Sequence, residues 1–470
     1  MLPHDVVAND QHTVALYGMT VQAGDRELES RIAETWHLSD GHSGRAVGIR
    51  GGLAGVARVP GIVAVGGSSQ NPSLDGCGDA PVVTTRYVTV TDPRARLRMH
   101  GPVEAPLAPG NGSQCSGVGS SVMFHMSTTD PVLELVELGM PWTGLDPFIF
   151  TIHHLDDYPE GNDVLGPESS LVGRQIGMDF SYQDGWSMYH GSRVPGFPQH
   201  PHRGFETVTV VRRGYVDHSD SLGATARYGE GDVQWLTTGS GIQHAEMFPL
   251  IRQDRRNPLE LFQIWLNLPP ESKLVPAHFG MLWGEDIPTV TPTPGVQVDV
   301  MAGRLNGHEA PAPPPDSWAS RADSAFAIWL IRLDEGASWQ LPATEAGVNR
   351  TLHFFDGAMA LIGSTPVERG TGVRLRSDVP ADIVNTGPAA EFLLLQGRPI
   401  GAPVIQMGPF VMNTPEEIQQ ALSDYRRTGF GGWPWSGPDP VHARIEGRFA
   451  IHADGRVEHR DMAPVATSAD

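Results

Sequence analysis

The chain carries short runs of hydrophobic residues, many alternating with polar ones, that are separated by turns containing glycine. In residues 205–220, "FETVTVVRRGYVDHSD", two such runs flank Gly214, and residues 229–247, "GEGDVQWLTTGSGIQHAEM", repeat the arrangement. A third run, "LELFQIWLNLP", ends at Pro269. A period of two residues is typical of strands with one buried face, and several short strands in succession predict an antiparallel sandwich or barrel.

A second set of similar runs follows, with a proline-rich segment near its start. The segment, "EAPAPPPDSW" at residues 309–318, is expected to be extended and to lie on the surface. The runs of the second set are "VQVDVMAG", "FAIWLIRL", "TLHFFDGAMALIG", "GVRLRS", "ADIVNTG" and "EFLLLQG". The sequence therefore predicts an all-β protein with two β domains in tandem.

One helix is predicted near the end of the chain. Thr414 is a suitable N-cap, Pro415 suits the first turn, and Gly429 follows the last turn. One face of this helix is apolar, with the spacing i, i+3, i+4, i+7, in Ile418, Ala421, Leu422 and Tyr425. We expect this helix to be structural.

Residues 1–125 differ from the rest in composition. They are rich in small residues and contain few aromatic side chains that could form a core: Tyr17, Trp36, Tyr87 and Phe124. We expect this part to be a disordered extension, with Met126 as an alternative start. The predicted organisation is an extension (1–125), a first β domain (126–290), a second β domain (291–412), a helix (413–430) and a tail (431–470).

The charge and the rare residues exclude several classes of protein. The net charge of −21 argues against a nucleic-acid partner, because such binding needs cationic residues at the phosphates. Lys273 is the one lysine among 33 basic residues, and its surroundings fit neither a P-loop nor a Schiff-base enzyme. Cys77 and Cys115 are too few for a disulfide framework or a thiolate cluster, although one disulfide between them stays open.

The sequence also favours a cytoplasmic location. The first residues lack the basic start and apolar core of a signal peptide, and no stretch of about 18 apolar residues could span a bilayer. We therefore expect a soluble, monomeric protein without a membrane partner.

Two pairs of side chains at strand spacing are candidate metal ligands. Residues two apart on a strand share a face, so His200 and His202 point the same way, and simple counting adds Glu206. His244 and Glu246 repeat this spacing. Three imidazoles and one carboxylate would suit Fe(II), Mn, Ni, Cu or Zn better than Ca or Mg.

The alternative is that these histidines are ordinary polar residues. A single His-X-His on a loop is more often solvated or hydrogen-bonded than bound to a metal, and the second pair at strand spacing is what favours a site. The remaining histidines of this region are expected to be ordinary: His153, His154, His190, His218 and His278.

Four segments closely resemble successive signature motifs of the pirin family, a branch of the cupins. They are "GFPQHPHRGFETVTVV", "GDVQWLTTGSGIQHAEM", "LELFQIWLNLP" and "GPFVMNTPEEIQQALSDY", and the match covers roughly residues 128–430 in the right order. The resemblance implies two tandem cupin (jelly-roll) barrels, the first with one metal, usually iron. Carried over by motif, the ligands are His200, His202, His244 and Glu246, whereas Glu206 is placed outside the ligand set, in the second shell or the barrel wall.

The resemblance also implies differences between the two barrels. The second barrel has His353 and Asn385 at the corresponding places, without a paired ligand, and is expected to be free of metal. The family pattern begins at residues 145–148, "LDPF", and the long segment from there to residue 192 is interpreted as a surface insertion that could cover the barrel mouth.

Two functions follow from the resemblance. Several bacterial pirin-like proteins resemble dioxygenases that open quercetin, a flavonol, with O2 and release carbon monoxide. In such a reaction the metal would acidify the substrate's 3-hydroxyl, and Glu246 would accept the proton. The alternative is a regulatory protein that binds protein partners according to its metal state, as eukaryotic pirins do. Candidate apolar groups near the cavity are Phe205, Trp235 and Phe262.

Overall fold

The computed structural model describes residues 53–59, 62–67 and 130–461. The first two ranges form the antiparallel strands β1 (Leu53–Val59) and β2 (Ile62–Gly67), in a unit separate from the remainder. The rest of the predicted extension over residues 1–125 lies outside the described residues.

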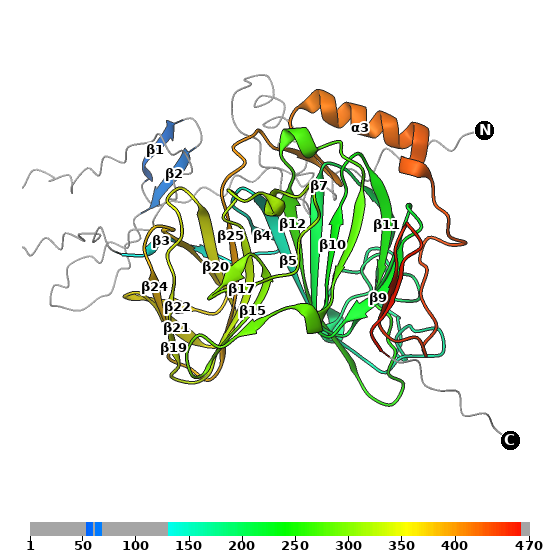
Figure 1. The fold of residues 1–470 in the computed structure, drawn as a ribbon, viewed down its shortest axis with the longest axis horizontal. Coiled ribbons are helices and arrows are strands. Elements are labelled where there is room, and N and C mark those ends of the chain that lie inside the picture. Colours follow the sequence, from blue (N-terminus) through cyan, green and yellow to red (C-terminus); the bar gives the residue numbers. More distant parts are fainter. Residues whose placement is uncertain (1–52, 60–61, 68–129, 462–470) are drawn as a thin grey trace, which may run out of the picture. The chain divides into compact units, whose positions relative to one another are not determined.

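Two six-stranded antiparallel sheets form the first barrel (Figure 1). In order across the first sheet, the strands are β13 (His278–Leu282), β10 (Val233–Thr237), β7 (Phe205–Arg213), β12 (Asn257–Asn267), β5 (Phe148–Tyr158) and β4 (Trp142–Thr143). Across the second sheet they are β29 (Val457–His459), β28 (Phe449–Ile451), β9 (Thr225–Gly229), β8 (Tyr215–Asp220), β11 (Ile242–Met247) and β6 (Gly196–His202).

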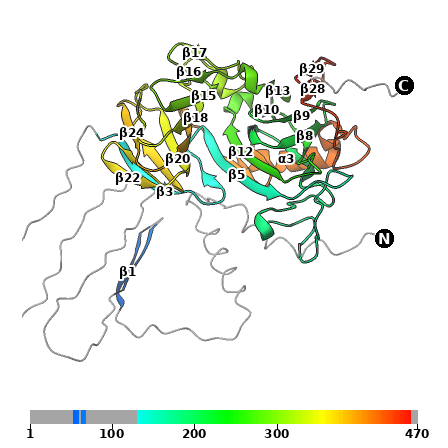
Figure 2. The same ribbon diagram turned by 90° about the horizontal axis from the view of Figure 1, so that it is seen from below.

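The second barrel has a seven-stranded and a four-stranded sheet, and it lies beside the first (Figure 2). The larger sheet contains β14 (Thr289–Val290), β15 (Val296–Ala302), β18 (Ala327–Leu333), β25 (Ala390–Gly397), β20 (Asn349–Asp356), β23 (Thr371–Leu375) and β3 (Val132–Glu137). The smaller contains β19 (Ser338–Leu341), β24 (Ala381–Asn385), β21 (Met359–Ile362) and β22 (Thr365–Glu368). The predicted pair of tandem barrels is thereby confirmed.

The first and last strands of residues 130–461 are exchanged between the barrels. Strand β3 precedes the first barrel in the sequence but pairs with β23 of the second. Strands β28 and β29 follow the second barrel in the sequence, in the segment predicted only as a tail, but β28 pairs with β9 of the first. Each barrel therefore contains a strand from beyond the other barrel in the sequence.

The predicted C-terminal helix is confirmed as α3 (Pro415–Thr428). Thr414 accepts from the backbone of Glu417 while the Glu417 carboxylate accepts from the backbone of Thr414, a capping box. Gly429 ends the helix with a φ of 53°, in the left-handed region that glycine tolerates. The remaining elements are short: β16 (Arg304–Leu305), β17 (His308–Glu309), β26 (Ile405–Met407), β27 (Phe410–Met412) and the 3₁₀ turns η1 (Gln183–Gly185), η2 (Pro270–Ser272), η3 (Gly284–Asp286), η4 (Trp318–Ser320) and η5 (Gly429–Gly431).

The segment interpreted as an insertion begins inside the barrel. Its first residues belong to β5, which pairs with β12 along its whole length. The part outside the sheets is therefore shorter, residues 159–195, and links β5 to β6. Tyr189 anchors it to β5, because its hydroxyl donates to Asp156 at 2.8 Å, and within the segment Arg174 donates to Asp179 at 2.9 Å.

A shared apolar core joins the two barrels. Val208 and Val210 of β7 and Phe262 of β12 belong to the same buried cluster as Ile328 of β18 and Leu393 of β25. One face of the first barrel's sheet thus packs on the second barrel. The opposite face, which carries the alternating residues, lines the interior of the first barrel.

We expect Phe262→Ala to weaken this shared core strongly. Phe262 is fully buried, and its ring lies 4.9 Å from that of Phe355 in a T-shaped contact. Removing a buried phenylalanine costs about 3–5 kcal/mol, which urea unfolding would measure. The control is Met359→Ala, because Met359 is exposed on the second barrel and should change stability little. Similar unfolding midpoints for the two variants would contradict the assignment.

Candidate metal centre

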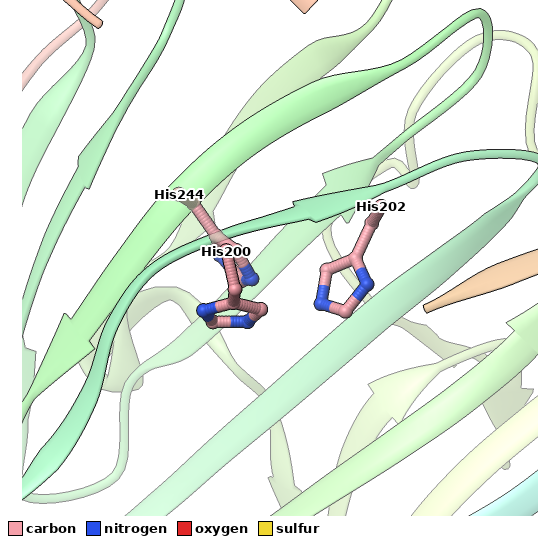
Figure 3. A group of neighbouring side chains, drawn as sticks. All are labelled: His200, His202 and His244. Carbon is pink, nitrogen blue, oxygen red and sulfur yellow. The ribbon is translucent and has the colours of Figure 1, made fainter. Parts of the chain in front are cut away.

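The three candidate histidines come from two neighbouring strands of the first barrel. Strands β6 and β11 are antiparallel, His200 pairs with His244, and His202 pairs with Ile242. Directly opposed residues share a face of a sheet, so His200 and His244 project together. Figure 3 shows the three imidazoles converging from the two strands.

The geometry of the imidazoles suits a metal ion. One ring nitrogen from each histidine lies within 4.8 Å of the others, and this is the one such group among the described residues. Nδ1 of His200 lies 2.8 Å from the Pro198 carbonyl, and Nδ1 of His202 lies 3.3 Å from that of Pro409. These contacts hold the Nδ1 proton and leave Nε2 free to bind a metal.

The buried environment keeps the three imidazoles neutral and leaves His244 without a hydrogen-bond partner. Burial lowers the pKa of His200 to about 4 and the pKa values of His202 and His244 well below 6.5, so they carry no positive charge that would repel a cation. Both ring nitrogens of the buried His244 lack a hydrogen-bond partner. Because buried polar groups are normally paired, His244 fits a metal ligand.

Glu246 lies beside this group. Glu246 follows His244 by two residues on β11, so its side chain lies on the same inner face, and a register shift in this pairing makes Phe197 its partner on β6. Its Oε2 is 3.7 Å from Nε2 of His244. Gln263 donates to the same carboxylate at 2.7 Å and Thr209 at 3.3 Å, and burial raises its pKa.

Glu206 faces the other way, toward the second barrel. Its carboxylate accepts from Thr237 at 2.7 Å and from Ser317 at 2.6 Å. Along β7, Thr207 and Thr209 lie on the opposite face from Glu206, and Thr209 donates to Glu246 in the barrel interior. Counting by twos from His202 fails because Gly204, with a φ of 85°, breaks the strand between β6 and β7.

His353 and Asn385, the two residues singled out in the second barrel, make other contacts. The buried His353 lies with Nδ1 3.0 Å from the Leu393 carbonyl and stacks on Trp142 at 5.2 Å. The amide of Asn385 donates to backbone carbonyls, including that of Asp334 at 2.9 Å. Both side chains hold neighbouring parts of the structure together.

The rings of His154 on β5 and Phe197 on the edge strand β6 lie 5.8 Å apart, where the two sheets meet at a seam. Near this seam the inward side chains of Ile152, Phe197, His200 and Gln263 are partly exposed. The rings of Phe197 and His200 lie 6.4 Å apart. Phe180, from the segment between β5 and β6, is exposed and lies 6.5 Å from Phe197.

Of the three aromatic residues proposed near the cavity, one contacts the site. The ring of Phe205 is 5.1 Å from that of His202. Trp235 and Phe262 belong to the core shared with the second barrel. Sequence reasoning missed Gln263 and Thr209; alternation along β7 and β12 would have placed both on an inner face, but it does not identify their common partner.

Among the residues that the structure describes, no helix combines the length and apolar character needed to cross a bilayer.

Comparisons with known proteins agree with this architecture. The family model described as "Pirin" matches residues 168–266, and that described as "Pirin C-terminal cupin domain" matches residues 328–431. A Pseudomonas aeruginosa protein named "Putative quercetin 2,3-dioxygenase" is 37% identical over 234 residues, which are 50% of this chain and 79% of the relative. The Homo sapiens protein named "Pirin" is 35% identical over 250 residues, 52% of this chain and 80% of that protein.

Solved structures are similar as well. The crystal structure of quercetin 2,3-dioxygenase from Acinetobacter baumannii matches with a TM-score of 0.52 at 25% sequence identity. The match covers 65% of this chain and 99% of that structure.

The buried Glu206 predicts a pH dependence of stability. Burial raises its pKa from 4.5 to about 7, so folding favours the protonated form. Its contribution is complete below pH 4.5 and is lost as the pH rises to about 7, by up to about 3 kcal/mol at 1.4 kcal/mol per pKa unit. Urea unfolding from pH 4.5 to 7.5 should show wild type losing stability relative to Glu206→Gln. Parallel pH profiles for the two proteins would exclude this origin.

Proposed function

The chain belongs to the pirin family, and from this premise we propose that it is a metal-dependent dioxygenase that opens flavonol-type substrates such as quercetin with O2. The observation that carries the proposal is the group of three neutral imidazoles beside Glu246, near the partly exposed side chains at the seam of the first barrel. Relatives named for quercetin dioxygenation support the substrate class.

The proposed ligands are His200, His202, His244 and Glu246. Three imidazoles and a carboxylate favour a divalent transition metal; we propose Fe(II), with Mn, Ni, Cu and Zn as alternatives to be tested. When bound, the metal supplies Lewis acidity that lowers the pKa of a substrate hydroxyl.

Glu246 is the proposed proton acceptor. Its carboxylate lies on the inner face, and the donors Gln263 and Thr209 fix its direction. A hydroxyl bound beside His244 would lie within reach of this carboxylate, as general-base catalysis requires. In the overall reaction both atoms of O2 enter the product, two carbon–carbon bonds of the flavonol ring break, and carbon monoxide leaves.

The seam offers an apolar approach for a flat aromatic substrate. Ile152 and Phe197 are partly exposed on either side of it, and Phe180 extends the aromatic surface outward. Stacking on these rings would orient the substrate and exclude water from its reactive oxygen.

We expect His200→Ala to lose most of its bound metal. The substitution removes one of three imidazole ligands, and metal content after loading with Fe(II) can be measured by elemental analysis. The matched control is His278→Ala, which removes an exposed imidazole from β13 of the same barrel. Normal metal content in His200→Ala would show that the ligand set is wrong.

We expect Glu246→Gln to slow turnover by about 10²- to 10⁴-fold, the usual contribution of a general base. Quercetin absorbance and O2 uptake would be followed together, with metal content measured on the same samples so that the rate is expressed per bound metal. A wild-type protein that binds about one metal per chain but consumes no quercetin with any of the five metals would contradict the enzymatic function and favour the regulatory one.

A further inference from the structure

We propose that the C-terminal strap, defined as residues 405–438, is part of the metal site, and that Gln243 is the positioning residue through which it holds the ligand strands. The strap comprises β26, β27, α3, η5 and the chain that follows η5 (Figure 1). This inference rests on the metal-binding part of the proposed function and does not depend on the reaction.

The ligand strands contact the strap through the side chains that alternate with the ligands. His200 and His244 point into the barrel, so their neighbours Gln199 and Gln243 point outward. The Gln243 amide oxygen accepts from Gln199 at 2.8 Å and from the Tyr425 hydroxyl at 3.2 Å. One outward side chain therefore joins both ligand strands to α3.

The nitrogen of the Gln243 amide is also bound by the strap. It donates to the carbonyl of Gly429 at 2.5 Å and to that of Gly432 at 3.0 Å. Gln243 is only 3% exposed, and its amide makes four hydrogen bonds. A shift of the strap would move this amide, and with it the backbone next to His244.

The strap also contacts a ligand directly. Pro409, in the turn between β26 and β27, provides the carbonyl that lies 3.3 Å from Nδ1 of His202. Such an acceptor fixes the tautomer and the direction of a metal-binding imidazole. His200 takes its acceptor from Pro198, within its own strand, so His202 depends on the strap in a way that His200 does not.

Further bonds fix the turn after His202. Arg203 donates to Asp424 of α3 at 2.9 Å, and its carbonyl accepts from the backbone of Val411 at 3.0 Å. The buried Lys273 donates to the carbonyls of Gly204 at 2.7 Å and of Val411 at 3.0 Å. The one lysine of the chain thus ties the ligand-bearing turn to β27.

The last residues of the strap also contact the ligand strands and their neighbours. The backbone of Gln199 donates to the Pro438 carbonyl at 2.7 Å, and the indole of Trp435 donates to the Asp220 carbonyl at 2.8 Å. Because a metal site tolerates only small displacements of its ligands, the strap and the metal should stabilise each other. Such a coupling is reciprocal: metal should protect the strap, and a loosened strap should weaken metal binding.

The first test uses the unmodified full-length protein and Zn(II) as a redox-inert probe. Hydrogen exchange of backbone amides is measured with and without Zn(II). We expect Zn(II) to slow exchange in the strap, including at Val411, while strands of the second barrel such as β21 stay unchanged. Protein that takes up no Zn(II) would overturn the proposed metal site. Protein that takes up Zn(II) with unchanged exchange in the strap would overturn this inference alone.

The second test compares Gln243→Ala with Gln340→Ala. Gln340 is an exposed glutamine that bonds Asp382 on the second barrel, so it controls for loss of a surface amide. We expect Gln243→Ala to weaken Zn(II) binding by about 10- to 100-fold and to alter the visible spectrum of bound Co(II), with no such change in Gln340→Ala. If Gln243→Ala does not fold, Tyr425→Phe removes one of its four bonds and should cause a smaller change of the same kind. Wild-type affinity and spectrum in a folded variant would refute the role of Gln243.

Discussion

Three buried imidazoles that face one another need partners for their nitrogens, and several other contacts in the first barrel depend on this constraint. Away from water their nitrogens would ordinarily need hydrogen-bond partners, yet both ring nitrogens of His244 have none in the protein. A bound cation would provide a partner for one nitrogen of each imidazole. Protonation would instead place like charges within a few ångströms of one another. The carbonyls of Pro198 and Pro409 hold two of the imidazoles in one orientation. Gln263 does the same for the neighbouring Glu246 by donating to its carboxylate.

The arrangement depends on the two faces of one sheet having different roles. Along β7, Thr209 lies on the inner face and donates to Glu246, while Val208 and Val210 belong to the core shared with the second barrel. The second barrel therefore supports the back of the sheet whose front carries Gln263 and Thr209. The second barrel can thus hold the site residues in place by packing alone, without contributing a metal ligand.

Much of the architecture could be predicted because it is encoded locally. The period-two runs, the capped helix and the two ligand pairs each depend on residues close together in the sequence, and the family motifs extended this to the order of the barrels. Counting along the chain misplaced Glu206, since a single glycine at position 204 changes the direction of the strand. Pro409 and Gln243 left no signal, because their roles come from contacts about 200 residues apart, made partly by backbone atoms that every residue type provides.

The exchange of terminal strands has a consequence for how the protein is made. During synthesis, β3 emerges first but has no partner until β23 has left the ribosome, and the first barrel's second sheet is incomplete until β28 follows. Neither barrel can be finished before the other has been translated almost completely, so the two should fold as one late, cooperative unit rather than in succession. For the same reason, cutting the chain between β13 and β14, where the first barrel gives way to the second, would not yield two self-sufficient halves, but two fragments that each expose an unpaired sheet edge.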